Sequence, residues 1–590
     1  MVRIPSHHGY VDKVPLPLGR GTFRVVWRGA GGCGGVVPMK KFLNDADSFV
    51  RESLEGLALT QPGLALLEGR TIAVQADRVV TGAAGRDSVP VALISGGGAG
   101  HEPAHAGFVA DGMLTAAVSG GVFASPSVDA VLDGIRAVTG TAGALLIVKS
   151  YTGDRLNFGL AAQLAQDEGY AVETVVVGDD IALGDADTHA GARGLAGTVL
   201  VHKIAGALAA SGADLAEVSG RARSVASRLA TMGVALRPGT MPGSGEATFE
   251  IDEDRIELGL GIHGESGVEQ VGHRPADDLA AELVDRVLAA RPLDDGARVA
   301  LLVNGLGGTP PAELAVLTRA VHRLLGERGL TVERAYQGSV MTSLEMAGAS
   351  VTVLPLEDGE TELLDAPTAS LAWPGGGGPV GHHTDVSVPD ADAGQVDPGE
   401  PDERARAAID AACQALLDDE HRLTELDQVV GDGDLGEALA RGARAWQDDP
   451  ADGSAASLLR VLSARCRRAI GGTSGPLYAA GLVAAAQALE DGADWRRALA
   501  AGVDGIQDLG GAAPGDGTMV DALRPAADAA PDGWEAVLAA AEEGVRGTVE
   551  GVSRKGRASY VGARGQGHAD PGAEAVLTWL RAVREAVRVG

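Results

Sequence analysis

Apolar runs alternate with amphipathic stretches over the first part of the chain. Between about residues 70 and 225, the runs at 89–94, 144–148 and 172–177 have the length and composition of strands. Amphipathic stretches at 156–166 and 197–210 lie between or after them. Strands that are apolar on both faces are typical of a parallel sheet covered by helices. The pattern therefore predicts an α/β subdomain over residues 39–225.

A second stretch with strand and helix signals covers residues 226–375. Its apolar runs lie at 299–303 and 351–356, and an extended run at 248–251 leads into 257–262. We expect a second α/β subdomain here, so that the first half of the chain is a two-part α/β structure.

The periodicity then disappears and returns in a different form. Residues 385–403 hold seven carboxylates and no Lys or Arg, after a glycine-rich segment that contains His382 and His383. We interpret residues 376–401 as a flexible acidic linker, in which the paired histidines are solvated rather than metal ligands. Residues 402–590 are Ala-rich and amphipathic throughout, with glycine-rich turns, which predicts about eight helices in an all-α bundle or barrel.

The first 38 residues differ from the rest of the chain. They hold five Lys or Arg against one Asp, and no hydrophobic period is sustained before Met39. We expect an N-terminal extension over residues 1–38 without ordered structure.

Composition narrows the classes of function. A net charge of −31 over 590 residues excludes the basic footprint that nucleic-acid binding needs. No apolar run approaches the roughly 20 residues of a membrane span. The three cysteines make no disulfide framework, so the cytoplasm is the expected compartment.

Residues 95–107, SGGGAGHEPAHAG, follow the first predicted strand. A strand followed by glycines and a helix start is how α/β proteins build a ligand site at the edge of a sheet. A phosphate loop is disfavoured because His101 stands where G-x-G-x-x-G needs glycine. A zinc helix over His101 and His105 is disfavoured because Pro103 interrupts it. A small-molecule pocket and a tight turn with a structural histidine both remain.

Two further motifs of the first half carry chemistry. Lys149 and Asp154, in KSYTGD, follow a buried strand, so both side chains should lie at the edge of the sheet. Asp154 could act as a general base for a hydroxyl group and Lys149 as a hydrogen-bond donor; a surface ion pair is the alternative. His263, in GLGIHGESG, is a candidate nucleophile or acid–base group, and a structural turn histidine is the alternative.

The helical half contains a carboxylate cluster and several glycine-rich loops. Asp427, Asp432 and Asp434 are suited to Mg²⁺ that bridges substrate phosphates, although the DGD segment could be a turn alone. The segment 471–475 opens a helix and could bind an anion through free amides.

Several of these segments occur together in one order. The segments SGGGAGHEPAHAG, KSYTGD, GLGIHGESG, the three aspartates, GGTSG, GDGTM and KGRASYVG follow one another in this order. With them the chain resembles, over residues 39–590, the single-chain, ATP-dependent dihydroxyacetone (glycerone) kinases. The resemblance implies a two-part α/β substrate half and a helical-barrel nucleotide half.

The resemblance also implies roles for individual residues. His263 would bond covalently to the substrate carbonyl carbon as a hemiaminal, Asp154 would activate the hydroxyl, and His101 would hydrogen-bond the substrate. Asp427, Asp432 and Asp434 would hold Mg²⁺. The other implied substrate contacts are Gly98, Ala99, Gly100 and Lys149, and the implied ATP contacts are Leu435, Gly436, Ala438, Thr473, Ser474, Gly510, Met519, Arg557, Asp570 and Gly572.

By this resemblance the chain is a kinase that uses ATP and Mg²⁺ to phosphorylate dihydroxyacetone or a close ketose or aldose such as glyceraldehyde. An erythrulose kinase, an FAD-splitting cyclase and a partner-binding regulatory protein are the alternatives. A homodimer is expected, in which each helical domain serves the partner's substrate half. Gly517 stands where the family usually has Lys or Arg, and Leu435 occupies a position that varies among relatives.

Overall fold

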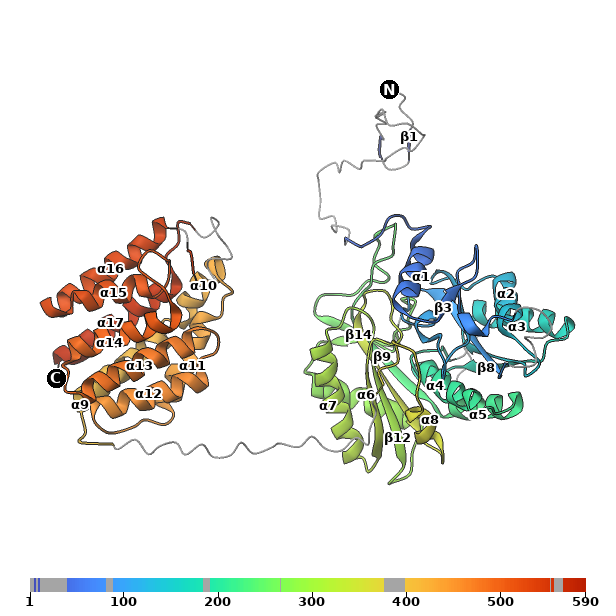
Figure 1. Cartoon of the computed structure of the whole chain (residues 1–590). Helices are drawn as coiled ribbons and strands as arrows, with labels where there is room; N and C mark the ends of the chain where they lie inside the picture. The colour runs from blue at the N-terminus through green and yellow to red at the C-terminus, as the bar shows by residue number, and fades with distance from the viewer. Residues whose placement is uncertain are drawn as a thin grey trace. The chain divides into compact units, whose positions relative to one another are not determined.

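The computed structural model describes residues 5–6, 9–10, 40–80, 89–183, 192–265, 267–375, 398–551, 553–555 and 566–589. The chain divides into two compact units, Met1–His383 and Thr384–Gly590 (Figure 1). No helix of the described residues is long and apolar enough to cross a membrane. Within the predicted N-terminal extension, only β1 (Pro5–Ser6) and β2 (Gly9–Tyr10), which pair antiparallel, are described. The rest of that extension and most of the predicted linker lie outside the described residues.

A mostly parallel sheet organises the first part of the N-terminal unit. Its strand order is β3-β4-β6-β5-β7-β8, and β6, β5, β7 and β8 run parallel. The strands are β3 Leu64–Leu66, β4 Ile72–Gln75, β5 Ala92–Ala99, β6 Ala116–Val122, β7 Ala144–Lys149 and β8 Val172–Val177. The helices are α1 Phe49–Thr60, α2 Val128–Val138, α3 Thr152–Asp167, α4 Gly197–Ala210 and α5 Leu215–Arg228.

Side chains that alternate along the strands bury both faces of this sheet. Ile94 and Leu146 pack with α2 and α3, whereas Leu93 and Ile147 pack with α4 and α5. This double coverage explains why the strands are nearly continuous apolar runs.

One local prediction is wrong. The strand expected at 89–94 is β5, and it continues through the glycines to Ala99 instead of ending before them. Gly96 pairs with β6, and a Cβ at this position would lie 2.2 Å from the carbonyl oxygen of Val118. No helix start follows: residues 101–105 form turns that lead into a short 3₁₀ helix, Ala106–Phe108.

A second six-stranded sheet, of order β11-β10-β9-β14-β12-β13, completes the N-terminal unit. Only the β12–β13 pairing is parallel. The predicted extended run at 248–251 is not a strand, and the run at 257–262 leaves its strand at Leu258. The elements are β9 Ala230–Arg237, β10 Arg255–Leu258, β11 Glu269–Gly272, β12 Arg298–Gly305, β13 Thr331–Gly338, β14 Ala347–Pro355, α6 Ala276–Ala290, α7 Pro311–Glu327 and α8 Glu360–Asp365.

The two sheets share a hydrophobic core. Leu93 and Ile147 of the first sheet belong to the same buried cluster as Leu302 and Met346 of the second part, with α4 among its members. The loops after β5 and β10 therefore meet inside one compact unit.

The C-terminal unit is all-α, as predicted. Its described residues form nine α-helices rather than about eight. They enclose an apolar cavity of about 830 Å³, lined in part by Cys413, Cys466, Tyr478, Trp534 and Trp579. The helices are α9 Glu403–Asp418, α10 Glu420–Val430, α11 Leu435–Gln447, α12 Ala455–Ala469, α13 Ser474–Glu490, α14 Trp495–Gly510, α15 Val520–Asp528, α16 Trp534–Glu550 and α17 Pro571–Val589.

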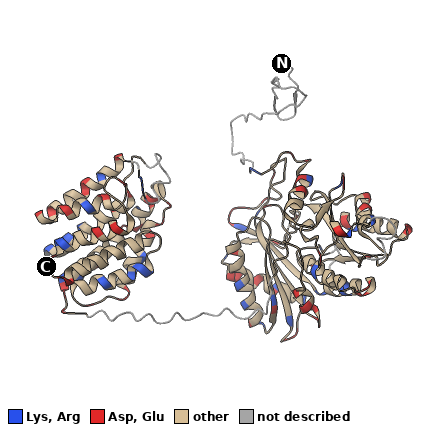
Figure 2. Ribbon diagram, in the orientation of Figure 1, with Lys and Arg blue, Asp and Glu red and all other residues tan. Residues whose placement is uncertain are grey.

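Charged residues of both signs are interspersed over each unit (Figure 2). This mixed distribution agrees with a generally acidic surface as the source of the negative net charge.

Candidate active site

His101 is fully buried in the turn after β5. Its Nδ1 atom lies 2.8 Å from the carbonyl oxygen of Thr342, which can only accept, so Nδ1 carries the proton. Burial, and then the positive charges of Lys149 and His263, hold the pKa of His101 well below its usual 6.5. The neutral ring therefore presents a lone pair at Nε2, which has no hydrogen-bond partner among the described residues.

His263 lies in the loop after β10 and is partly exposed, at 18% of its side chain. Its Nδ1 atom lies 3.2 Å from Oε1 of Glu265, and its backbone N–H donates to Oε2 of the same carboxylate at 3.1 Å. A carboxylate accepts the Nδ1 proton, so the opposite ring nitrogen, Nε2, is left as the nucleophilic atom. The ring centroids of His263 and His101 are 4.8 Å apart.

Lys149 and Asp154 come from the carboxyl end of β7 and the first turn of α3. Both are buried. Burial lowers the pKa of Lys149, against the opposing charges of Asp154, Glu265 and Glu102. Its Nζ atom has no hydrogen-bond partner among the described residues. Ser125 donates to Oδ1 of Asp154 at 2.5 Å.

Gly97 opens the space between these two charged groups. A Cβ on Gly97 would lie 3.1 Å from Nζ of Lys149 and 3.2 Å from Oδ2 of Asp154, and its φ is +149°. An L side chain is disfavoured there by both the contact and the backbone angle. Gly97 therefore lets the backbone lie close to the side chains of Lys149 and Asp154.

The glycines expected to contact substrate have a packing reason of their own. A Cβ on Gly98 would lie 2.8 Å from Cα of Phe123, and one on Gly100 would lie 2.9 Å from the Phe123 ring. Ala99, between them, is buried. Gly98 and Gly100 thus let the Phe123 segment approach, while Gly97, which the sequence motif did not single out, borders the charged groups.

Aromatic rings enclose the two histidines. Tyr151 and Phe123 lie 4.3 and 5.3 Å from the ring centroid of His263, and Phe123 stacks on His101 at 5.2 Å. Sequence reasoning missed Phe123, Tyr151 and Glu265 as members of the site. Tyr151 and Glu265 lie inside the motifs that carry Asp154 and His263, which is the one signal the sequence offered for them.

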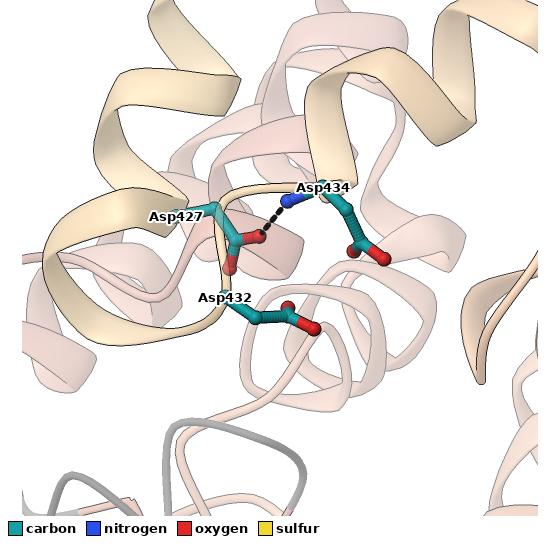
Figure 3. Close-up of side chains that lie close together, drawn as sticks. All are labelled: Asp427, Asp432 and Asp434. Atoms are coloured by element: carbon teal, nitrogen blue, oxygen red, sulfur yellow. Dashed lines mark hydrogen bonds between the residues drawn. The ribbon is translucent and has the colours of Figure 1, made fainter. Parts of the chain in front are cut away.

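The three aspartates of the helical unit lie close together (Figure 3). One carboxylate oxygen from each of Asp427, Asp432 and Asp434 can be chosen so that all lie within 4.8 Å of one another. Asp427 lies in the last turn of α10, and its Oδ2 accepts the backbone N–H groups of Asp434 and Leu435 at 2.9 and 3.1 Å. The turn is folded onto the Asp427 carboxylate, and three oxygen ligands of this kind suit Mg²⁺.

Two more carboxylates extend this acidic region. Burial raises the pKa of Asp570 to about 7, and the negative charges of Asp521 and Asp427 act in the same direction. Asp521 accepts the backbone N–H groups of Gly515 and Thr518 at 2.6 and 2.8 Å and so orders the GDGTM loop. Asp570 caps α17 through the N–H of Ala573.

The remaining candidate nucleotide contacts lie at helix ends or packing points. Gly436 approaches α10 closely, since its Cβ would lie 2.2 Å from the carbonyl oxygen of Glu420, and Ala438 is buried one turn from the aspartates. Thr473 and Ser474 lie at the start of α13, Gly510 is the last residue of α14, and Met519 precedes α15. Gly572 packs against Met519, since a Cβ on Gly572 would lie 3.4 Å from the backbone nitrogen of Met519. Arg557 lies outside the described residues.

Gly517 has a structural explanation. Its φ is +72°, and a Cβ would lie 2.6 Å from Oγ and 2.9 Å from Cα of Ser553. Ser553 thus occupies the space that a side chain at position 517 would need.

Comparison with known proteins covers both units. The Dak1 domain matches residues 62–372, and the DAK2 domain matches residues 429–585. A putative 3,4-dihydroxy-2-butanone kinase of Solanum lycopersicum is 42% identical, over 93% of this chain and 98% of the relative. The triokinase/FMN cyclase of Homo sapiens is 40% identical, over 93% and 99%. The L-erythrulose 1-kinase of Mycolicibacterium smegmatis is 36% identical, over 93% and 99%.

Solved structures agree with these matches. The native dihydroxyacetone kinase of C. freundii aligns at 37% identity and a TM-score of 0.66, over 92% of this chain and 99% of that one. The same enzyme in complex with AMP-PNP and Mg²⁺ aligns at a TM-score of 0.64, over 92% and 99%. The two domain matches, in one chain and in this order, show that the chain belongs to the family of single-chain dihydroxyacetone kinases.

Proposed function

We propose that the chain transfers the γ-phosphate of ATP to dihydroxyacetone or to a close short-chain ketose or aldose such as glyceraldehyde. One observation carries the choice of a carbonyl substrate. His263 has its Nδ1 atom at a carboxylate. His101, whose ring centroid is 4.8 Å from that of His263, has a buried Nε2 lone pair with no hydrogen-bond partner among the described residues. A nucleophile and an acceptor side by side suit a molecule with both a carbonyl and a hydroxyl group.

In the first step, Nε2 of His263 bonds to the carbonyl carbon. The electron pair of the C=O π bond moves to oxygen, which takes up one proton, and the imidazole gives up its Nδ1 proton on the side of Glu265. The proton count is unchanged, and the product is a neutral hemiaminal. A plain polyol such as glycerol offers no carbonyl carbon and is not captured. A substrate hydroxyl donates to Nε2 of His101, which cannot itself donate.

Asp154 then acts on the hydroxyl that is phosphorylated. Ser125 occupies its Oδ1 atom, so Oδ2, which faces the space beside Gly97, accepts the hydroxyl proton. The freed oxygen bonds to the γ-phosphorus, and the bond from that phosphorus to the β-phosphate oxygen breaks to release ADP. Lys149 supplies positive charge beside Gly97.

Asp427, Asp432 and Asp434 fit Mg²⁺, because three carboxylates point an oxygen into one small region. When bound there, Mg²⁺ neutralises charge on the ATP phosphates. The ATP contacts proposed around it are Leu435, Gly436, Ala438, Thr473, Ser474, Gly510, Met519, Arg557, Asp570 and Gly572.

We further propose a homodimer in which each helical unit serves the partner's substrate half. The free cysteines Cys413 and Cys466 agree with a reducing compartment, and we place the reaction in the cytoplasm.

The test is an Mg·ATP-dependent phosphorylation assay with dihydroxyacetone, L-erythrulose, glyceraldehyde and glycerol. We expect turnover of dihydroxyacetone or glyceraldehyde and none of glycerol. Faster turnover of erythrulose would move the substrate to a four-carbon ketose, as named for the M. smegmatis relative. Release of a cyclic flavin phosphate from FAD would add the cyclase activity. No turnover of any ketose or aldose would refute the kinase proposal and favour a partner-binding role.

A further inference from the structure

A buried ion pair lies behind the His263 loop. Arg193, 5% exposed and just before α4, donates from Nε to Oδ2 of Asp180 at 2.6 Å; Asp180 follows β8 and is 3% exposed. One terminal nitrogen of the same guanidinium, Nη2, donates to the carbonyl oxygen of Gly259 at 2.6 Å. Arg193 therefore ties the segment after β8 to the loop that carries His263.

The other terminal nitrogen of Arg193 faces Glu265. A Cβ on Gly261 would lie 2.7 Å from Nη1 of Arg193 and 2.2 Å from Oε2 of Glu265. The two groups thus face the same small space, which stays open because residue 261 has no side chain. Through this space the positive charge of Arg193 acts directly on the carboxylate that holds Nδ1 of His263.

The charges around Glu265 come from several elements. His263 lies on its own loop, Arg193 and Asp180 on the segment between β8 and α4, and Lys149 and Tyr151 at the end of β7. Burial alone would raise the pKa of Glu265, but the hydrogen bond and charge of His263, with the charge of Arg193, lower it overall. Asp180 acts in the opposite direction, and its pairing with Arg193 weakens that effect.

A contribution to folding stability does not explain why Arg193 and Asp180 are buried as an ion pair. The cost of removing two charges from water offsets most of their attraction, so a buried ion pair contributes little net stability. The position of this one, between a sheet edge and a reactive loop, fits a role in the site.

We propose that Arg193, held by Asp180, is a positioning residue that keeps Glu265 a carboxylate aimed at Nδ1 of His263, and thereby sets the reactivity of Nε2. The proposal rests on the proposed capture of the substrate by His263. Without the guanidinium charge, Glu265 takes up a proton at higher pH. A protonated Glu265 no longer accepts the Nδ1 proton, so capture fails at the acid end of the pH range.

The test compares the full-length protein with the double variant Asp180→Asn/Arg193→Met, which removes both charges and leaves neither buried alone. Dihydroxyacetone capture is followed by intact-protein mass, and KM and kcat are measured from pH 4 to 9. We expect the acid limb of kcat/KM to move up by about one pH unit, so that the loss is small at pH 6, grows towards about tenfold at pH 4 and is absent at pH 8.5. The loss should lie in KM, with kcat changed by less than about threefold.

Two further variants separate this role from a merely structural one. Gly261→Ala leaves the ion pair intact but places a methyl group between Arg193 and Glu265, and the same acid-limb shift is expected. Arg334→Met/Asp365→Asn removes another arginine–carboxylate pair of the same unit and should leave the pH profile unchanged.

The outcomes distinguish the role of Arg193 from substrate capture by His263. Suppose that the wild-type chain forms the adduct. If both site variants then keep the wild-type acid limb, or lose the same activity at every pH, the role of Arg193 is overturned and the proposed function stands. Absence of the adduct from the wild-type chain would overturn the proposed function and this inference with it.

Discussion

The histidines near the substrate site differ in what their Nδ1 atoms contact. Nδ1 of His101 faces a backbone carbonyl, Nδ1 of His105 faces the Ser95 hydroxyl at 3.3 Å, and Nδ1 of His263 faces a carboxylate. A carboxylate stabilises positive charge on the ring better than the neutral groups do. These contacts support the proposed roles of His263 as the nucleophile and of His101 as a hydrogen-bond acceptor.

Replacing His263 should therefore abolish covalent capture. We expect His263→Ala to lose the protein–substrate adduct and at least about a hundredfold in kcat/KM, because covalent and proton-transfer assistance disappear together. Intact-protein mass with dihydroxyacetone measures the first effect and a coupled kinase assay the second. His273→Ala, at an exposed histidine of the same unit, serves as the control. An adduct that persists in the His263 variant would show that another residue is the nucleophile.

Asp432 should separate nucleotide use from substrate capture. We expect Asp432→Asn to raise the Mg²⁺ and ATP concentrations needed for turnover by about tenfold or more, since one charged ligand of three is lost. The adduct at His263 should form as in the wild type, because the aspartate belongs to the other unit. Mg²⁺ titration of the kinase assay and intact-protein mass provide the two readouts. Loss of both Mg·ATP-dependent turnover and adduct formation in this variant would contradict the assignment of nucleotide binding and substrate capture to different units.

Sequence reasoning named residues of the site where a motif carried them and missed those defined by contacts. Asp154, His101 and His263 are candidates from the sequence because each lies in a glycine-rich or strand-end segment. Thr342 was not, because its contact with His101 joins residues 241 positions apart. Arg193 likewise depends on two segments that only the fold brings together.

At the scale of elements, apolar runs predicted the buried strands best. The helix at 197–210 was predicted with the bounds that α4 has, because its ends carry a glycine and a change to polar residues. The glycines of β5 were assigned to a loop, since glycine is disfavoured in strands; here they let β5 and the Phe123 segment approach. The mixed second sheet was not foreseen, because its pairing depends on how distant strands order themselves.

Helix α4 buries a histidine whose titration should be visible in stability. Burial lowers the pKa of His202 to about 3, and its Nδ1 lies 3.0 Å from the carbonyl oxygen of Thr198. The unfolded chain takes up a proton as the pH falls through about 6.5, whereas the folded chain does not until about pH 3. The N-terminal unit therefore loses stability in this window as the pH falls.

We expect His202→Gln to remove this part of the pH dependence. Between pH 7.5 and 5.0, the wild type should lose about 2 kcal/mol more unfolding free energy than the variant, from one proton over about 1.5 pH units. Urea unfolding at the two pH values measures the difference. His273→Gln, which changes an exposed histidine, should follow the wild type. Equal losses in His202→Gln and wild type would show that His202 is not buried as a neutral ring.

The loop that holds Gly517 should not tolerate the basic residue that the family resemblance leads us to expect at this position. We expect Gly517→Lys to destabilise the helical unit by about 1–2 kcal/mol, because the backbone has a positive φ and Ser553 fills the Cβ position. Gly515→Ala, at φ +95° but with open space around it, separates the two costs. Chemical unfolding gives the comparison. A Gly517→Lys chain that is as stable as wild type and a better kinase would show that the loop can rearrange.

At the scale of the whole molecule, the proposed substrate-binding residues and the proposed Mg²⁺ ligands lie in separate units, so the proposed reaction needs one unit to meet another. The meeting can occur within one chain or between two. Homo-oligomers commonly close as symmetric dimers, in which each subunit gives the other the same surface.

Co-expression of two impaired chains, assayed at Mg²⁺ and ATP concentrations too low for Asp432→Asn to turn over, distinguishes these arrangements. His263→Ala keeps a competent helical unit, and Asp432→Asn keeps a competent substrate half. If each helical unit serves the partner's substrate half, one of the two active sites in a mixed dimer is complete. Random assortment makes about half of the dimers mixed, so co-expression should restore about a quarter of the wild-type activity. Each variant expressed alone gives the baseline, and differently tagged chains confirm that mixed dimers form. Mixed dimers no more active than that baseline would show that each chain's helical unit serves its own substrate half.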